Sequence, residues 1–417
     1  MRMYSRPVKL SASAKKRLAG KFLIVALGGT VVYGCKSTNL GSTTKDAGAD
    51  LPASASQAAP LPPELADNID FIKQEASTTV ETQFKQLGGI AHRDFHIKGL
   101  CAKGRMIVDP DAVGLPQAYR VGPFATKGEY ALYGRFSNGF PDLNVDDRKP
   151  SVFGFGIKML GVNGTKFQMP GSTKPANHNQ DWNLATGRTF AFPNAALYRE
   201  QRELGNAKFG LRHPIILANV LRGASILDQF TAASYHSQVA LHYGEKYIAK
   251  FSAAPCDGNE RTISPLTALR RTRDYLREGL KQQLVSGSAC FLFRAQIRPA
   301  DENLDPSHAD WATRFPKDNP SIDWSPDVIP FTTLARIEFP QQPDIDSLQP
   351  ICEAFSINPG NALQVFRPIE TDTLMTARYR GAYEGSVSKR MALNGLVQKE
   401  PEAPAPGQVD SWLQATP

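Results

Sequence analysis

His96 is the residue of this chain whose surroundings most favour chemistry. Histidine titrates nearest to neutral pH, so a general base would be drawn from the seven histidines present. The segment Arg93-Asp-Phe-His-Ile-Lys-Gly99 is predicted to form a strand, whose alternation places His96 on the face opposite Phe95. An arginine and a histidine with a glycine three residues on favour a lined pocket. The alternative is an exposed or hydrogen-bonded structural histidine.

Further short motifs follow His96 in an order that one protein family shares. Arg93-x-x-His96-x-Lys98-Gly99 resembles the distal-histidine motif of haem catalases, and Arg135-Phe-Ser137 resembles their next barrel segment. The likeness extends over most of residues 65–395, to a bacterial branch of catalase-like haem proteins. The later segments that carry it are Asp147-Arg148, Phe155-Gly-Ile-Lys158, Tyr235-His-Ser-Gln238, Gly244, Lys250-Phe251, Pro255, Cys290-Phe-Leu-Phe293, Trp324 and Arg367-Pro368.

This resemblance implies a fold, a cofactor and residue roles. The fold would be a single catalase-type antiparallel β-barrel with flanking helices, and a haem b would lie buried inside the closed barrel. His96 would take a proton from bound peroxide and return it to the outer oxygen, while Ser137 would hydrogen-bond His96 and fix its tautomer. Arg93 and Arg135 would neutralise the haem propionates. The alternative for these arginines is ordinary surface ion pairing.

Two positions depart from the catalase pattern. Catalases carry a distal asparagine where the stretch Asp181-Trp-Asn-Leu-Ala-Thr-Gly187 places Thr186, a shorter hydrogen-bond donor. This change weakens the expectation of catalase turnover more than the expectation of haem binding. Catalases also use a tyrosinate ligand with an arginine four residues before it, whereas here Arg367 is followed at that spacing by Thr371.

Candidate axial ligands therefore lie in the last predicted helix. Tyr383 is favoured as the ligand of the haem iron, because Tyr383-Glu-x-Ser386-x-x-Lys389-Arg390 resembles the ending of the bacterial branch. Tyr379, one helical turn earlier, is the reserve, and Arg380 is a further cofactor-binding candidate. The alternatives are that one tyrosine packs in the core while the other holds a propionate, or that no axial ligand is present.

The N-terminal region is typical of an export signal. Residues 1–34 contain seven basic and no acidic side chains, an apolar run over 22–27, and then small residues. The run is shorter than the roughly 20 apolar residues of a spanning helix. Val-Tyr-Gly-Cys35 resembles a bacterial lipobox, which predicts lipidation of Cys35 and a membrane-anchored lipoprotein facing the periplasm. The alternatives are an uncleaved anchor, or a plain signal peptide with an incidental cysteine.

Composition divides the rest of the chain into three parts. Residues 35–63 are predicted to be the anchor cysteine and a disordered linker, because they are rich in Ser, Thr, Ala, Gly and Pro. Residues 64–397 form the predicted barrel domain. Residues 398–417, with Pro-Glu-Ala-Pro-Ala-Pro, are predicted to be a disordered tail.

Charge and cysteine content exclude two further classes of function. The net charge is +8, but residues 1–34 hold nearly all of the excess, so a nucleic-acid partner is not expected. Apart from Cys35 there are four cysteines, which allow three pairings. Their spacing fits no zinc motif, and we expect one disulfide at most.

The order of the elements predicts an α+β chain. An amphipathic helix is expected over 65–87, then strands near 95–100, 105–108, 130–136, 152–159 and 165–169. Helical spacing returns over 195–231, strands over 235–254, and Ser264-Pro265 predicts the start of a helix that runs to Leu284. Strands over 289–298 and 331–339 and a helix over 372–393 complete the pattern.

The hypothesis is a haem-dependent, catalase-like enzyme that acts on hydrogen peroxide or an organic hydroperoxide at the bacterial envelope. Lipid hydroperoxides would suit a membrane-anchored site. The alternative is a non-catalytic haem-binding or structural envelope lipoprotein that kept the barrel and lost the chemistry.

Overall fold

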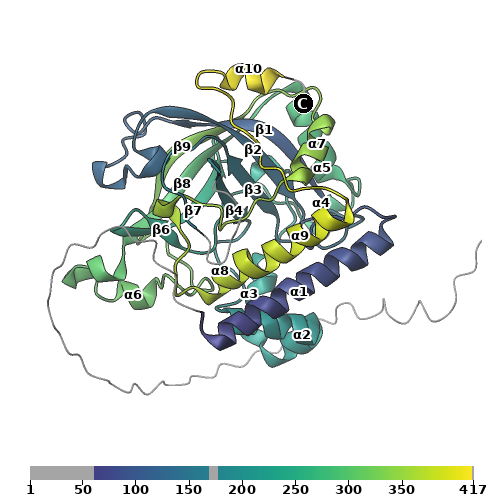
Figure 1. Ribbon diagram of the computed structural model, residues 1–417, viewed down its shortest axis with the longest axis horizontal. Coiled ribbons are helices and arrows are strands. Elements are labelled where there is room, and N and C mark those ends of the chain that lie inside the picture. The colour runs from purple at the N-terminus through teal and green to yellow at the C-terminus, as the bar shows by residue number, and fades with distance from the viewer. Residues whose placement is uncertain (1–60, 169–176, 416–417) are drawn as a thin grey trace, which may run out of the picture. The chain divides into compact units, whose positions relative to one another are not determined.

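The computed structural model describes residues 61–168 and 177–415 (Figure 1). The predicted signal over 1–34, Cys35 and the linker as far as residue 60 lie outside the described residues. The described residues all belong to one compact unit. No helix among these residues is both long enough and apolar enough to cross a membrane.

Within the described residues, eight antiparallel strands close into a barrel. The strands are neighbours in the order β5-β4-β3-β2-β1-β9-β8-β7, β5 also pairs with β7, and β6 pairs with β7 as a ninth strand. Closure removes exposed sheet edges, and the prediction of a single antiparallel barrel is confirmed. The strands are β1 Gly99–Val108, β2 Gly128–Ser137, β3 Gly154–Met159, β4 Gln180–Ala185, β5 Tyr235–His236, β6 Leu241–Tyr243, β7 Tyr247–Pro255, β8 Ala289–Pro299 and β9 Phe331–Phe339.

Aromatic rings fill the interior of the barrel. Phe136 and Phe155 stack with ring centroids 4.3 Å apart, and Phe155 packs on Phe291 at 5.2 Å. Trp182 meets Phe293 edge-on at 4.9 Å. All five side chains are buried, and an interior packed at this density has no space for a porphyrin. The expectation of a haem inside the closed barrel is therefore wrong.

A layer of helices covers one side of the barrel. Helix α1 lies beside α9, although the two come from opposite ends of the described chain (Figure 1). Gly385 permits this approach, because a Cβ there would collide with the carbonyl oxygen of Lys73. The helices are α1 Pro63–Gln86, α2 Ala195–Arg212, α3 Pro214–Gly223, α4 Pro265–Ala268, α5 Tyr275–Ser286, α6 Trp311–Arg314, α7 Gln349–Ala354, α8 Thr373–Ala377, the π-helical turn Arg378–Ala382, α9 Tyr383–Leu393 and α10 Val409–Gln414.

The predicted helix from Ser264 to Leu284 is interrupted. Ser264 is the cap as expected, since its Oγ accepts a hydrogen bond from the N–H of Thr267 at 3.1 Å. The chain then leaves the helix between α4 and α5, where the carbonyl of Arg273 accepts bonds from the Asp147 N–H at 2.9 Å and from Lys98 Nζ at 3.1 Å. These hydrogen bonds to distant parts of the chain take the place of the backbone hydrogen bond that the Arg273 carbonyl would accept within a continuous helix. The strand expected over 165–169 is described only to residue 168, where Lys166 makes an isolated bridge with Leu363.

Two disulfides are present where one at most was expected. Cys101 on β1 pairs with Cys352 on α7, and Cys256 pairs with Cys290 on β8. The second pair joins the adjacent ends of two neighbouring strands, a proximity that spacing in the sequence does not reveal. The first pair fixes α7 to the barrel wall.

The C-terminal tail packs on the barrel, so the prediction of a disordered 398–417 is wrong for its described part. Lys103 Nζ on β1 donates to the carbonyl oxygens of Trp412 at 3.0 Å and Ala415 at 2.9 Å. Glu400 lies 2.7 Å from Lys158 Nζ, a fully buried ammonium group. Buried lysines on the barrel wall thus find their partners in the tail. These contacts order the tail although its proline-rich composition favours disorder.

Replacing Glu400 by Gln is expected to lower the free energy of unfolding by about 1–2 kcal/mol, because the buried Lys158 loses a charged partner and keeps Asp181. Glu402→Gln, at an exposed position in the same segment, is the matched control and is expected to change little. Urea denaturation of the two variants measures the difference. Equal midpoints would show that the tail does not hold Lys158.

Candidate functional site

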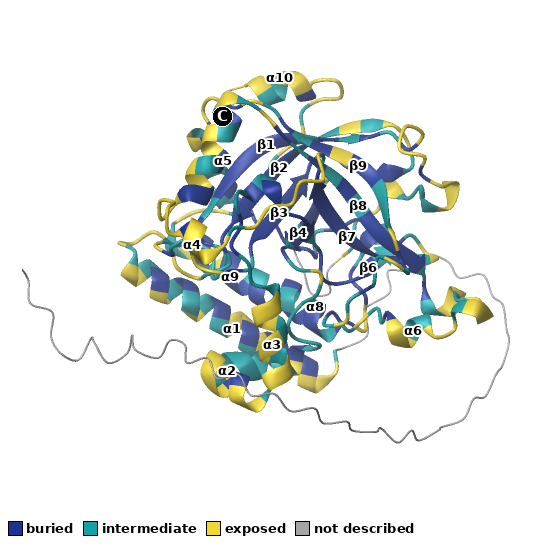
Figure 2. Ribbon diagram, turned by 180° about the vertical axis from the view of Figure 1, so that it is seen from behind, coloured by how far each residue is buried: buried dark blue, intermediate teal, exposed yellow. Residues whose placement is uncertain are grey.

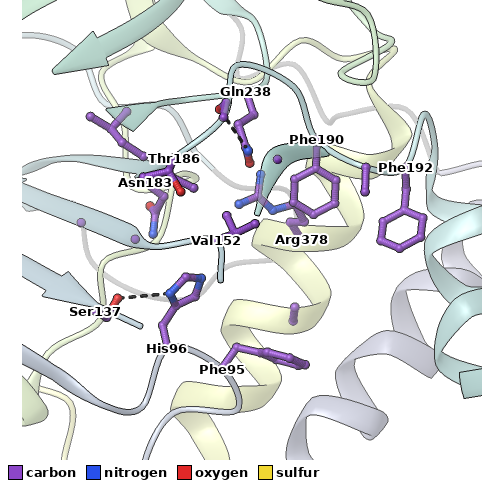
Figure 3. A pocket seen from close by; sticks show the side chains of 18 of the residues that line it. Phe95, His96, Ser137, Val152, Asn183, Thr186, Phe190, Phe192, Gln238 and Arg378 are labelled. Atoms are coloured by element: carbon purple, nitrogen blue, oxygen red, sulfur yellow. Dashed lines mark hydrogen bonds between the residues drawn. The ribbon is translucent and has the colours of Figure 1, made fainter. Parts of the chain in front are cut away.

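A cavity of about 810 Å³ lies between the barrel wall and the helical layer. Strands β3 and β4 supply one wall, and α2, α3 and the α8–α9 segment supply others. Figure 3 shows His96, Val152, Asn183, Phe190 and Arg378 turned toward this space. Its lining is mixed, with apolar side chains beside several polar and cationic groups.

His96 lies in a loop before β1, so its placement in a strand was wrong. Its backbone takes a left-handed conformation, with φ 57°, and this reverses the side-chain alternation expected of a strand. Phe95 and His96 consequently both line the cavity, whereas Lys98 turns away to a buried ion pair with Asp147 at 2.9 Å. His96 therefore lines a pocket as predicted, but its left-handed backbone conformation puts it there and not the alternation of a strand.

Ser137 and Gly154 fix the imidazole ring. Ser137 Oγ and His96 Nδ1 are hydrogen-bonded at 3.1 Å (Figure 3), the pair that the resemblance implied. Ser137 stands opposite Gly154 in the β2–β3 register. A Cβ at position 154 would lie 2.8 Å from His96 Nδ1 and 2.9 Å from Ser137 Oγ, so only glycine leaves room for the ring.

The cavity keeps His96 neutral. Burial lowers the pKa of His96 to about 4, and the nearby Arg135 and Arg378 guanidinium groups add to the effect. At pH 7 the ring can therefore accept a proton.

Thr186 lines the cavity at the end of β4, as predicted. Its Oγ1 accepts a hydrogen bond from the N–H of Phe153 at 3.0 Å, which orients the hydroxyl. Three residues earlier, Asn183 also lines the cavity, and sequence reasoning missed it. Its Nδ2 donates to the carbonyl of Ile357 at 3.0 Å, whereas its Oδ1 is buried without a partner. A buried, unpartnered oxygen on the cavity wall is available to a ligand.

Buried positive charge exceeds negative charge on one side of the cavity. Arg93 and Arg135, both predicted, and Arg390, which was not assigned a role, lie around the carboxylate of Glu353. The Asp94 carboxyl group, also in the cavity wall, interacts with Arg390 as well. Burial and the neighbouring Arg93 lower the pKa of both Arg135 and Arg390 to about 9. Arg390 Nε is buried without a partner. These guanidinium groups are arranged to receive further anionic groups.

The π-helical turn determines which tyrosine faces the cavity. An α-helix would place residue 379 above residue 383 on one face, but the extra residue of the π-turn places Arg378 beside Tyr383 instead. Arg378 Nη2 donates to Tyr383 Oη at 3.3 Å. Tyr383 lines the cavity, while Tyr379 and Arg380 do not; Tyr379 packs on Phe167.

Burial raises the pKa of the Tyr383 phenol, and the Arg378 guanidinium opposes that rise. Arg378 is thus the arginine that accompanies the favoured tyrosine, in place of Arg380. Arg378 lies five residues before Tyr383 and Arg390 seven residues after it. This spacing was the signal in the sequence that could have identified both arginines as cavity residues.

The residues of the cavity fit a haem. An imidazole and an arginine-paired phenol line one space, so both could contact one bound group. The arginine cluster carries more charge than Glu353 compensates, which suits two propionates, and Val152, Phe190 and Phe192 offer apolar walls for a flat ring. Among the described residues, no cluster of His, Cys, Asp and Glu could hold a metal ion directly.

The barrel with its flanking helices is a catalase-type fold, as comparison with solved structures shows. A bacterial catalase superposes with a TM-score of 0.55 at 14% identity, covering 84% of this chain and 66% of that one. A fungal catalase superposes with a TM-score of 0.52 at 14% sequence identity, covering 76% of this chain and 64% of the catalase. Catalase A from Saccharomyces cerevisiae superposes with a TM-score of 0.53 at 13% sequence identity, covering 72% of this chain and 63% of the catalase.

The chain thus spans less than two thirds of the length of these catalases. No protein-family model matches the chain, and no curated protein matches it either. What the comparisons show is therefore the fold.

The low pKa of His96 predicts loss of stability in acid. The unfolded imidazole binds a proton below about pH 6.5 and the folded one only near pH 4, so stability falls as pH decreases between these values. From pH 7 to pH 5 this group alone contributes a loss of about 2 kcal/mol. The His96→Asn variant is expected to lose correspondingly less over the same range, as measured by urea denaturation at both pH values. Equal losses in the two proteins would contradict a buried, neutral His96.

Proposed function

We propose that the chain is a haem-dependent, catalase-like protein that decomposes or uses hydrogen peroxide or organic hydroperoxides at the bacterial envelope. One observation carries the proposal. A single cavity brings together a neutral imidazole bonded to Ser137, a phenol bonded to Arg378, and more buried guanidinium groups than carboxylates. The catalase-type fold supports it.

Each side chain then has a separate task in holding the cofactor. Tyr383 would hold the haem iron through its phenol oxygen, and Arg378 would stabilise the phenolate form. Arg93, Arg135 and Arg390 would hold the propionates. The haem would supply an iron site for the peroxide oxygen and the electrons that cleavage of the O–O bond requires.

His96 would transfer the proton. As a neutral base it would accept the proton of the inner peroxide oxygen and deliver it to the outer oxygen, which then departs as water or, from an organic hydroperoxide, as an alcohol. Ser137 would hold the ring in one tautomer and orientation during both transfers. The Thr186 hydroxyl and the Asn183 amide would hydrogen-bond the bound peroxide.

The proposed location is the periplasmic side of a bacterial membrane. The basic residues and apolar run within 1–34 support export, and the Val-Tyr-Gly-Cys35 sequence supports lipidation of Cys35. The part of the predicted linker that precedes residue 61 would let the folded domain stand clear of its anchor.

A second candidate function is haem binding without turnover. The observation that favours it is the Thr186 hydroxyl, whose oxygen is already engaged by the Phe153 N–H. A hydroxyl whose orientation is fixed in this way is less able to turn toward bound peroxide and donate a hydrogen bond to it.

Titration with haem tests the assignment of Tyr383. We expect Tyr383→Phe to lose the phenolate-to-iron absorption bands and to bind haem at least about tenfold more weakly, since the iron loses a protein ligand. The matched control is Tyr379→Phe, which also removes one buried phenol and should retain the wild-type spectrum. Loss of the bands in Tyr379→Phe alone would reverse the assignment, and no Soret band in any of these proteins would refute haem binding.

Turnover tests the role of His96. We expect His96→Ala to retain the Soret band and to lose about 100-fold or more of peroxide-dependent turnover, the usual contribution of a positioned base. His242→Ala serves as control, because His242 on β6 bonds Glu370 at 2.9 Å and does not line the cavity. Haem-loaded wild-type protein without turnover on hydrogen peroxide, alkyl hydroperoxides or fatty-acid hydroperoxides would favour the second candidate.

A further inference from the structure

Helix α3 and the end of α2 form an apolar surface that is open to solvent. None of the ten residues of α3 is buried, and Figure 2 shows the helix coloured mainly as exposed. Leu211, Ile215 and Leu221 are 87%, 77% and 55% exposed. Together with Leu217 and Val220 they make up what we call the α3 surface. Contiguous aliphatic side chains in water are unfavourable, and such patches mark interaction surfaces.

The chain around the α3 surface is basic. Lys208, Arg212 and Arg222 are exposed in this stretch, and no acidic residue occurs between Glu203 and Asp228. Arg212 pairs with the earlier Glu200 at 2.7 Å. A short apolar helix flanked by cations is typical of segments that lie in the interface of an anionic bilayer, with the aliphatic side chains among the lipids and the cations at the headgroups.

The same helix forms part of the wall of the cavity. Asn219, Val220, Arg222 and Gly223 line the space that also holds His96. Val220 and Arg222 are themselves exposed, so the cavity reaches the surface of the protein beside α3. A surface that contacts α3 therefore lies next to the opening of the cavity.

We propose that the α3 surface docks on an anionic phospholipid bilayer and that the cavity admits lipid hydroperoxides from it. Three observations agree on this partner: uncovered aliphatic side chains, unbalanced positive charge around them, and continuity with the cavity. The predicted anchor at Cys35 would hold the domain at such a membrane. The substrate class rests on the function proposed above, whereas the docking itself does not.

Vesicle sedimentation of the full chain without haem tests the docking. The double variant Ile215→Ser/Leu221→Ser is expected to bind vesicles containing phosphatidylglycerol about tenfold more weakly than wild type. The matched control is Leu266→Ser/Leu269→Ser at α4, where the side chains are 77% and 67% exposed but lie outside the cavity wall. Its binding should be unchanged. Residues 1–60 are common to all three proteins, so their contribution cancels.

A local probe reports on the position of α3 itself. Tryptophan emission from an Ile215→Trp variant should be quenched by brominated lipids beyond the wild-type level, and emission from Leu266→Trp should not. Equal binding by the two double variants, or no added quenching at position 215, would overturn the proposal. Self-association that only the α3 double variant loses, without any change in vesicle binding, would assign the surface to a second copy of the chain and would also overturn it.

Because these measurements need no haem, their outcome is separate from that of the haem titration. Docking without haem binding would leave the α3 surface as a membrane site and remove only the proposed substrate. Haem binding without docking would overturn the proposal for the α3 surface and leave the proposed haem function in place.

Discussion

Uncompensated positive charge beneath the helical layer is the constraint on which the site depends. Arg135 and Arg390 are buried close to the partly buried Arg93, and the carboxyl groups of Glu353 and Asp94 do not balance the three guanidinium groups. A chain that served only its own stability would gain by replacing such a cluster with apolar side chains. Its presence beside a cavity is what supports the proposed haem, whose propionates would bring negative charge to these guanidinium groups.

Two backbone irregularities direct the side chains that face the cavity. The left-handed residue His96 turns its ring over Ser137 and Gly154, against the alternation of a strand. The π-turn over Arg378–Ala382 brings Arg378 next to Tyr383. Conformations of this kind cost stability, and they are retained where surrounding packing and function require them. Both occur here at the walls of the same cavity.

The barrel serves as a rigid wall and contributes no interior site. Its aromatic core is filled, and the cavity described above lies where helices from distant parts of the chain cover the barrel wall. The disulfide between Cys101 and Cys352 ties α7, and with it the neighbouring Glu353, to β1. The C-terminal tail supplies partners for Lys103 and Lys158 on the same wall. Precise positioning of the site thus draws on both ends of the described chain.

The amino-acid sequence by itself determined the α+β pattern and most strand and helix positions, because periodicity is a local property. The barrel and the cavity residues His96, Ser137, Thr186, Arg93, Arg135 and Tyr383 were expected from short motifs that resemble those of catalases. The sequence did not determine the location of the cavity, the conformation at His96, the exchange of Arg380 for Arg378, the second disulfide or the packed tail. Each of these depends on contacts between segments far apart in the chain. Such contacts acquire their energy only when the tertiary structure forms, and there they override local propensity.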